Sequence, residues 1–516
     1  MWGWRFFAEP TNNTARRLRK GGRWLKAPVP SGQSMFRYAH SIDANERLHY
    51  DLCIIGAGAA GITIARKFLN SGHSVALLEG GDFEISKRSQ DIYNGISDGY
   101  ADLSTARLRY FGGTTNHWAG YCRPPTAAEF KNRDWIPETK WPLSLQDFSS
   151  YYDGATQIVE IPNEFDIATW AKKLNTTPLT FDTPGLEQGV TVLSPPVRFG
   201  TKYRDEIGSS KAVTCFLNAN VREFVPAEHG NAIESVNIRR FDGADIKLAA
   251  KFFVLACGGI ENPRLLLNSN NMFSNGIGNR SDMVGRFFAD HRVVRAGRAL
   301  ISYGKAEIFR RDSWRTGKNK IVPYLRQNIS QDTSTIGCIL GLNLSRQSNS
   351  IIARFERKLS RAIGQGVDEY EIHAYAEPIP NRSNRIILTD RRDSLGLRQI
   401  KLTYSYSALE KEAILAAIEK LAIALGSAGA GHAQATLQEN DADAFMNWGY
   451  HHYGTTRMSD NRRNGVVDRD LRVHDMANLF IAGTSVYPSG SLMTPTLTLV
   501  ALALRLSDHL KRKLKQ

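Results

Sequence analysis

A glycine-rich turn between two apolar segments constrains this chain more than any other feature. The turn reads Gly56-x-Gly58-x-x-Gly61, and Ala59 and Ala60 open the segment that follows it. Gly56 permits a tight turn, Gly58 lets the backbone approach a pyrophosphate, and Gly61 lets helix and strand pack closely. A helix N-terminus at this place favours negative charge. The spacing alone is weak evidence, because it also occurs in ordinary turns.

The segments around the turn make the prediction more specific. Residues 50–55 form a short apolar strand, residues 62–71 have helical spacing, and residues 74–79 form a second strand that ends at Glu79. This order is typical of a parallel, doubly wound α/β unit. A carboxylate at the end of the second strand can accept hydrogen bonds from ribose hydroxyls. The chain is therefore predicted to bind a dinucleotide, and at this point FAD and NAD fit equally.

The size and composition of the chain fit two or three lobes that share a large core. Its 516 residues are 42% hydrophobic and 23% charged, which argues against a disordered, collagen-like or coiled-coil protein. The net charge of +15 is spread along the chain, apart from a basic cluster in residues 16–26. No nucleic-acid-binding module accompanies this charge, so we expect a solvated basic surface and no nucleic-acid partner.

Cysteine usage and the chain ends indicate a reducing compartment, and we expect a cytoplasmic location. The five cysteines are odd in number and form no C-x-x-C pair, which argues against a disulfide framework and a metal site. No secretory signal is convincing, and the apolar run at residues 497–504 is too short to span a membrane. The aromatic and basic N-terminal segment could contact a membrane surface, but a frayed terminus or packing over its own domain is the simpler interpretation.

Hydrophobic periodicity indicates further regular structure. Residues 290–405 are rich in strand-like segments with long polar loops. The other predicted elements are antiparallel strands at residues 213–225 and 232–242, buried strands at 251–256 and 479–482, an amphipathic helix at 408–425 and a final helix at about 495–513.

Three distant motifs decide between the dinucleotides. They read FGGTTNHWAG at residues 111–120, VLACGGIENPRLL at 254–266, and HHYGTTRM at 451–458, which leads to NLFIAGTSVYP at 478–488. With the glycine turn, the chain resembles the glucose–methanol–choline (GMC) oxidoreductase family from about residue 50 to residue 510. The stretch GGTTNHW and the segment PNRSNRI at residues 380–386 are most similar to the branch that contains pyranose oxidase and the fructose and gluconate dehydrogenases.

The resemblance implies a fold and a domain order. The fold class is α/β, with a Rossmann-like FAD-binding domain of the GMC type and a sheet-based substrate-binding domain of α+β character. The expected domains are a basic N-terminal extension at residues 1–48, the first part of the FAD-binding domain at 49–290, the substrate-binding domain at 291–440, and the C-terminal part of the FAD-binding domain, with the catalytic histidine, at 441–516.

The resemblance also implies that the dinucleotide is FAD. His117 matches the histidine that carries the flavin covalently in pyranose oxidase, so a bond from its imidazole to the flavin is one interpretation. The other is that His117 only packs on the flavin edge or hydrogen-bonds it. Beside the glycine turn and Glu79, the implied FAD contacts are Gly112, Gly113, Thr114, Asn116, Val221, Gly483, Pro495 and Thr496. For Val221, a competing interpretation is an ordinary strand end without a role in FAD binding.

The third motif supplies the predicted chemistry. Oxidation of an alcohol by a flavin needs a base for the hydroxyl proton, and a histidine suits this because its pKa lies near neutral pH. The family places that histidine three residues before the glycine of a Gly-Thr pair, which indicates His451 and leaves His452 as the second choice. The branch has an asparagine before Pro-Thr-Leu-Thr, but this chain has Thr494 there. The Asp290-His291 pair is expected to be a structural hinge outside the active site.

These residues together predict an FAD-dependent enzyme that oxidises a CH–OH group of a sugar, polyol or glycoside. Its re-oxidant is oxygen or a separate electron acceptor, either a protein or a quinone, because the sequence contains no haem-attachment or iron–sulfur motif. One alternative is a flavin-binding protein with weak or no turnover, in which FAD is structural; Thr494 is its support. An NAD-linked enzyme is a further alternative, and the segment around Gly112 argues against it.

Overall fold

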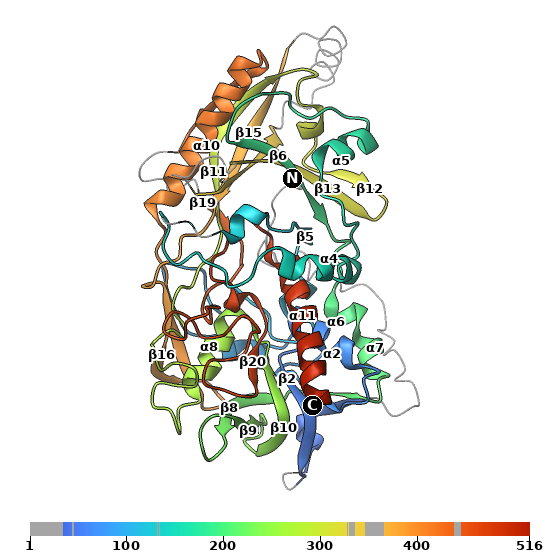
Figure 1. Ribbon diagram of the computed structural model, residues 1–516, viewed down its shortest axis with the longest axis vertical. Coiled ribbons are helices and arrows are strands. Elements are labelled where there is room, and N and C mark those ends of the chain that lie inside the picture. The colour runs from blue at the N-terminus through green and yellow to red at the C-terminus, as the bar shows by residue number, and fades with distance from the viewer. Residues whose placement is uncertain are drawn as a thin grey trace, which may run out of the picture.

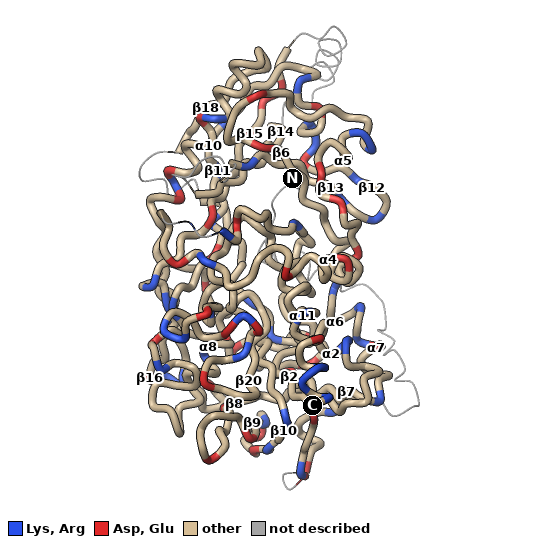
Figure 2. Tube along the Cα trace, in the orientation of Figure 1, with Lys and Arg blue, Asp and Glu red and all other residues tan. Residues whose placement is uncertain are grey.

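Two large sheets, one in each lobe, organise the chain (Figure 1). The computed structural model describes residues 35–43, 46–131, 133, 135–327, 329, 336–345, 366–437 and 445–516. The basic cluster and the aromatic start of the chain lie outside the described residues. Within those ranges, no helix is both long and apolar enough to cross a membrane. Lys and Arg are spread over both lobes and interspersed with Asp and Glu (Figure 2).

The first sheet is mostly parallel. Its order is β1-β7-β3-β2-β10-β9-β8, and β20 pairs with the end of β10. Only β9 pairs antiparallel with its neighbours, β10 and β8. The strands are β1 (Phe36–Tyr38), β2 (Leu48–Ile55), β3 (Val75–Leu78), β7 (Val213–Leu217), β8 (Asn220–Pro226), β9 (Ile233–Arg239), β10 (Asp245–Leu255) and β20 (Leu479–Ile481).

Helices cover the parallel part of this sheet. The strands β3 and β7 are buried along their whole length, as expected of parallel strands with both faces covered. Because β2, β3, β10 and β20 run parallel, their carboxyl ends meet at one edge of the sheet. In open α/β sheets that edge is where ligands bind.

The second sheet has nine strands and is antiparallel. Its order is β18-β11-β15-β14-β13-β6-β5, with β12 beside β13 and β19 beside β11. Helix α10 packs along it and shares its hydrophobic core (Figure 1). The strands are β5 (Tyr121–Cys122), β6 (Leu186–Leu193), β11 (Arg292–Ser302), β12 (Trp314–Thr316), β13 (Asn319–Gln327), β14 (Cys338–Leu344), β15 (Val367–Ala376), β18 (Gly431–Ala435) and β19 (Phe445–Trp448).

A small third sheet and the helices complete the fold. The third sheet has the order β16-β17-β4, with β4 (Ile96–Asp98), β16 (Arg385–Arg392) and β17 (Arg398–Thr403). The α-helices are α2 (Ala59–Phe68), α3 (Lys87–Gln90), α4 (Gln146–Ile158), α5 (Ile167–Leu174), α6 (Phe199–Lys202), α7 (Arg204–Gly208), α8 (Gly258–Asn268), α10 (Ala408–Ser427) and α11 (Pro495–Lys515).

One predicted strand pairing was wrong in part. Residues 213–225 were expected to be antiparallel, but the left-handed Asn218, with φ +54°, divides them into β7 and β8. Strand β7 joins the parallel part of the sheet beside β3, and only β8 pairs antiparallel with β9. The domain limits and the cytoplasmic location stay predictions. Strand β6 lies in the second sheet, although the predicted substrate-binding domain begins after it.

Candidate active site

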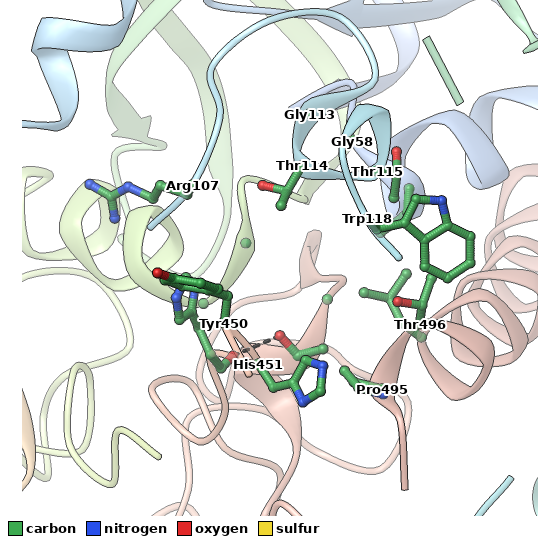
Figure 3. Close-up of a pocket in the computed structure, with 18 of the residues that line it drawn as sticks. Gly58, Arg107, Gly113, Thr114, Thr115, Trp118, Tyr450, His451, Pro495 and Thr496 are labelled. Carbon is green, nitrogen blue, oxygen red and sulfur yellow. Dashed lines mark hydrogen bonds between the residues drawn. The ribbon is translucent and has the colours of Figure 1, made fainter. Parts of the chain in front are cut away.

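A cavity opens at the carboxyl edge of the first sheet and extends to the second sheet. Three loops at that edge line it, namely the turn after β2, the start of α8 after β10, and Gly483 after β20. The second sheet contributes side chains from β13, β14 and β15 on the other side. In Figure 3, Gly58, Gly113 and Thr114 lie on one side of the cavity, and His451 and Pro495 lie across from them. We call these the glycine end and the histidine end.

The glycine end is built from backbone. Gly56 has φ +103°, and a Cβ there would lie 2.6 Å from the carbonyl oxygen of Ala256, so the turn requires glycine. A Cβ on Gly61 would lie 1.9 Å from the carbonyl oxygen of Gly56, which shows how closely α2 packs on the turn. Around Gly58, by contrast, there is open space within 4 Å of a Cβ. A phosphate can therefore approach the backbone at Gly58 and the N-terminus of α2.

Glu79 lies at the same end and is held in place by backbone donors. Its carboxylate accepts hydrogen bonds from the N–H groups of Ala57, at 3.1 Å, and Gly81, at 2.8 Å. The side chain is buried and lines the cavity. An oriented carboxylate beside a phosphate-accepting turn is the arrangement that a dinucleotide ribose needs. The donor set at the glycine end therefore fits the predicted FAD.

Most of the predicted site residues line this one cavity. The lining includes Gly56, Gly58, Ala59, Ala60, Glu79, Gly113, Thr114, Val221, His451, His452, Gly483, Thr494, Pro495 and Thr496. Gly61, Gly112, Asn116 and His117 do not line it.

Asn116 and His117 make contacts outside the cavity lining. Asn116 braces the loop, since its amide donates to the carbonyl oxygen of Phe111, at 2.7 Å, and accepts from the N–H of Gly200, at 3.0 Å. His117 is exposed, and its ring lies edge-on to Tyr110 at 6.2 Å between centroids. A covalent bond between His117 and FAD stays a prediction.

The histidine end contains two imidazoles in hydrogen-bond contact. His451 Nδ1 lies 2.9 Å from His291 Nδ1, and His291 Nε2 lies 2.8 Å from the carbonyl oxygen of Ser491. A carbonyl only accepts, so His291 carries its proton on Nε2 and its Nδ1 is an acceptor. His451 must then donate from Nδ1, which leaves its Nε2 unprotonated. The carbonyl of Ser491 thus fixes the tautomer of His451 through His291.

Burial keeps both imidazoles neutral. Desolvation lowers the pKa of His291 to about 4. Desolvation is the main cause that lowers the pKa of His451 well below its usual range, and the charge of Arg123 acts in the same direction. His451 is therefore neutral at neutral pH, which is the form that can accept a proton.

His291 corrects the expectation that the Asp290-His291 pair is a hinge outside the site. His291 lines the cavity and contacts His451. The Asp290 carboxylate accepts from the backbone N–H groups of Tyr450, at 2.9 Å, and His451, at 2.7 Å. Burial raises the pKa of this carboxyl to about 7. The pair therefore holds the segment that carries His451, which the sequence alone did not reveal because 160 residues separate the two histidines.

His452 faces a different network. Its Nε2 lies 3.1 Å from the hydroxyl of Tyr100, which also donates to Asp290 at 2.7 Å. Burial lowers the pKa of His452 to about 3. With Nε2 engaged by Tyr100, His452 is less suited than His451 to accept a proton from a ligand.

Thr494 and Arg123 meet beside the imidazoles. Thr494 is buried, and among the residues described its Oγ1 has no hydrogen-bond partner. The backbones of Arg123 and Thr494 form an isolated antiparallel bridge. Both residues line the cavity. The sequence motifs pointed to Thr494. They gave no signal for Arg123 or for Tyr375, whose hydroxyl accepts a hydrogen bond from Arg123 at 2.6 Å.

Comparison with known proteins relates part of this chain to a protein family. Residues 380–503 match the family described as GMC oxidoreductase. The chain therefore carries a GMC oxidoreductase domain. It is 25% identical to the fructose dehydrogenase large subunit of Gluconobacter japonicus over 92% of this chain and 100% of that protein. It is 23% identical to 2-methyl-1,2-propanediol dehydrogenase of Mycolicibacterium austroafricanum over 90% of this chain and 95% of that protein.

Solved structures of two oxidases share the fold of this chain. Pyridoxine 4-oxidase from Mesorbium loti superposes with a TM-score of 0.54 at 16% identity, covering 89% of this chain and 99% of that one. A formate oxidase of Aspergillus oryzae, described for its FAD modification, superposes with a TM-score of 0.54 at 15% identity, covering 91% of this chain and 99% of that one.

The family, the fold and the enzyme class predicted from the sequence are confirmed. The GMC relatives are named as dehydrogenases and oxidases, so the alternative of a protein without turnover is not favoured. The GMC match also confirms the FAD prediction at the level of the family. The roles of individual residues stay predictions.

Proposed function

We propose that this chain is an FAD-dependent oxidoreductase that oxidises a CH–OH group of a sugar, polyol or glycoside, with His451 as the base. One observation carries the proposal. The cavity joins a phosphate-accepting glycine turn to an imidazole whose tautomer leaves Nε2 unprotonated. Phosphate binding and proton acceptance in one cavity are what a flavin-dependent alcohol oxidation requires.

The glycine end would hold FAD. The open space at Gly58 would admit the pyrophosphate, Glu79 would accept from the ribose, and Gly113 and Thr114 lie on the path toward His451. When bound, FAD supplies the acceptor for the hydride that leaves the alcohol carbon.

The histidine end would handle the hydroxyl proton. His451 Nε2 would take the proton of the substrate hydroxyl, while its Nδ1–H stays bonded to His291. The resulting positive charge would form in a site whose burial disfavours it, so the proton would leave again readily. Thr494 Oγ1, which has no described protein partner, would hold the substrate hydroxyl in line with His451.

The electron acceptor is proposed to be oxygen or a separate protein or quinone. The relative named as a fructose dehydrogenase large subunit supports an acceptor on a partner chain.

A visible spectrum of the purified protein tests the proposal. We expect a flavin band that an alcohol from a panel of sugars, polyols and glycosides bleaches without oxygen, and that returns with oxygen or a dye acceptor. A protein without a flavin band, or a band that dithionite bleaches and no alcohol does, would contradict it.

A further inference from the structure

One ionised side chain stands out on the second-sheet side of the cavity. Arg123 follows β5, and it is the only ionised group among the described lining residues that the second sheet and its adjoining loop contribute. It is 5% exposed. A guanidinium cannot shed its charge by losing a proton, and a buried charge needs an anion or a full set of hydrogen bonds.

The described residues give Arg123 hydrogen bonds but no anionic partner. One terminal nitrogen donates to the hydroxyl of Tyr375 at 2.6 Å, and the other donates to Thr191 Oγ1 at 3.4 Å. The guanidinium also lies over the ring of Tyr324, 4.6 Å from its centroid. These partners are neutral, and none of the ion pairs among the described residues includes Arg123.

Glu129 does not fill that role. Its carboxylate acts on Arg123 electrostatically, but its oxygens accept from Ser491 Oγ, from the N–H of Leu492 at 2.7 Å and from the N–H of Thr126. Glu129 therefore holds the loop that carries the carbonyl of Ser491. The N–H groups of Arg123 that do not donate to Tyr375 or Thr191 can serve a ligand in the cavity.

Arg123 also lies next to the reacting groups. Its backbone pairs with that of Thr494, whose hydroxyl is unpartnered. Its partner Tyr375 packs on the ring of His291 at 4.8 Å between centroids. A ligand group that Arg123 holds is thus close to the hydroxyl that Thr494 and His451 would hold.

The rest of this wall carries no charge. Val293, Val322, Pro323 and Ile339 line it, and its remaining polar groups are the hydroxyls of Thr191 and of the tyrosines, two of which already accept from Arg123. An anionic ligand group would therefore find its strongest partner in Arg123.

We propose that Arg123 binds a carboxylate of the substrate, so that the enzyme prefers hydroxy acids, of which the sugar acids are the carbohydrate case. The inference rests on the proposed function and names its substrate class. A carboxylate presents two oxygens at the spacing of the guanidinium fork, which gives orientation as well as affinity.

Matched pairs of substrates test the proposal. Each alcohol is assayed beside the acid in which a carboxylate replaces one CH2OH group, such as galactose with galacturonate, glucitol with gluconate and glycerol with glycerate, using a dye acceptor. We expect kcat/KM to be about 10²-fold higher for the acid in at least one pair, the scale of a charge-assisted contact. Methyl esters of the acids should lose this advantage. The pairs separate sugar acids from simple hydroxy acids.

Variants then assign the preference to Arg123. In Arg123→Met the ratio of kcat/KM for acid over neutral alcohol should fall to about one, and in Arg123→Lys part of it should remain. Arg298→Met is the matched control, since it removes an exposed charge from the same lobe and should keep the wild-type ratio. Simple carboxylates should inhibit the wild type competitively and the Met variant weakly.

Each other outcome overturns the inference. If the wild-type enzyme has the same kcat/KM for the neutral alcohol as for the acid in every pair, the inference is wrong, whether or not the variants fold. An equal loss on both members of a pair in Arg123→Met would make Arg123 a positioning residue instead. The proposed function fails separately, if the protein has no flavin band or if no alcohol of either kind bleaches it.

Discussion

The two ends of the cavity are built by different means. The glycine end uses backbone from consecutive residues, where the turn at Gly56, Gly58 and Gly61 needs no side chain to work. The histidine end uses side chains from segments more than a hundred residues apart, such as His291 and His451. The first end is set by backbone packing, within the turn and against Ala256, and the second by side chains that distant segments bring together. A substitution at the glycine end should therefore have an effect that can be read from the nearest backbone atoms. The effect of a substitution at the histidine end depends on the side chain that the residue contacts.

The largest effect is expected from a substitution that disrupts the glycine end. In Gly61→Ala the new Cβ would overlap the carbonyl oxygen of Gly56, and backbone must move to relieve it. We expect a loss of about 3 kcal/mol in the free energy of unfolding, measured in urea, with loss of bound flavin. Gly58→Ala is the matched control, because its Cβ has open space. It should unfold as the wild type does within about 0.5 kcal/mol and bind flavin more weakly. If both variants have equal stability, the close packing at Gly61 is not decisive.

The next largest effect is expected from the hydrogen bonds through which His291 fixes the tautomer of His451. In His291→Ala the Nδ1–H of His451 loses its acceptor, and we expect kcat to fall by about 10²-fold with little change in KM. His291→Asn places an amide oxygen near the lost Nδ1 and should restore most of the rate. A merely structural role would give two variants with the same losses in kcat and in thermal stability, and no recovery with asparagine.

Thr494 should give a smaller effect. Thr494→Val keeps the shape of the side chain and removes the hydroxyl, which has no described partner. The expected loss is about tenfold in kcat/KM, the value of one hydrogen bond to the substrate. Thr494→Asn introduces the residue of the related branch, and its kcat/KM should equal or exceed that of the wild type. Unchanged kinetics in the valine variant would remove Thr494 from the site.

The pH profile should show the smallest effect. The base acts when neutral, and burial together with the charge of Arg123 lowers the pKa of His451. The acid limb of kcat/KM should therefore lie below pH 6.5, the usual pKa of histidine. Asp290 faces the same segment, and burial raises its pKa to about 7, so Asp290→Asn separates its titration from that of His451. An acid limb above pH 6.5 that persists in Asp290→Asn would contradict the buried, neutral base.

The same contrast explains what the sequence could predict. The glycine turn, Glu79, the strands and the two long helices were predictable because each depends on local spacing and periodicity. His451 was reachable through its motif. His291 and Arg123 were not, because their importance lies in contacts with His451, Tyr375 and Thr494 that only the packed lobes create. The pairing of β7 was misjudged for a similar reason, since residues far along the chain decide which strand lies beside it.

The account rests on His451 Nε2 as the base that works beside a bound flavin. Anaerobic stopped-flow measurement of flavin reduction by an accepted alcohol tests this most directly, since it isolates the chemical step. In His451→Ala the reduction rate should fall by about 10³-fold while the flavin band remains. In His452→Gln, where the neighbouring imidazole is lost instead, the rate should fall far less. A His451→Ala enzyme that retains flavin and is reduced as fast as the wild type would contradict the central claim.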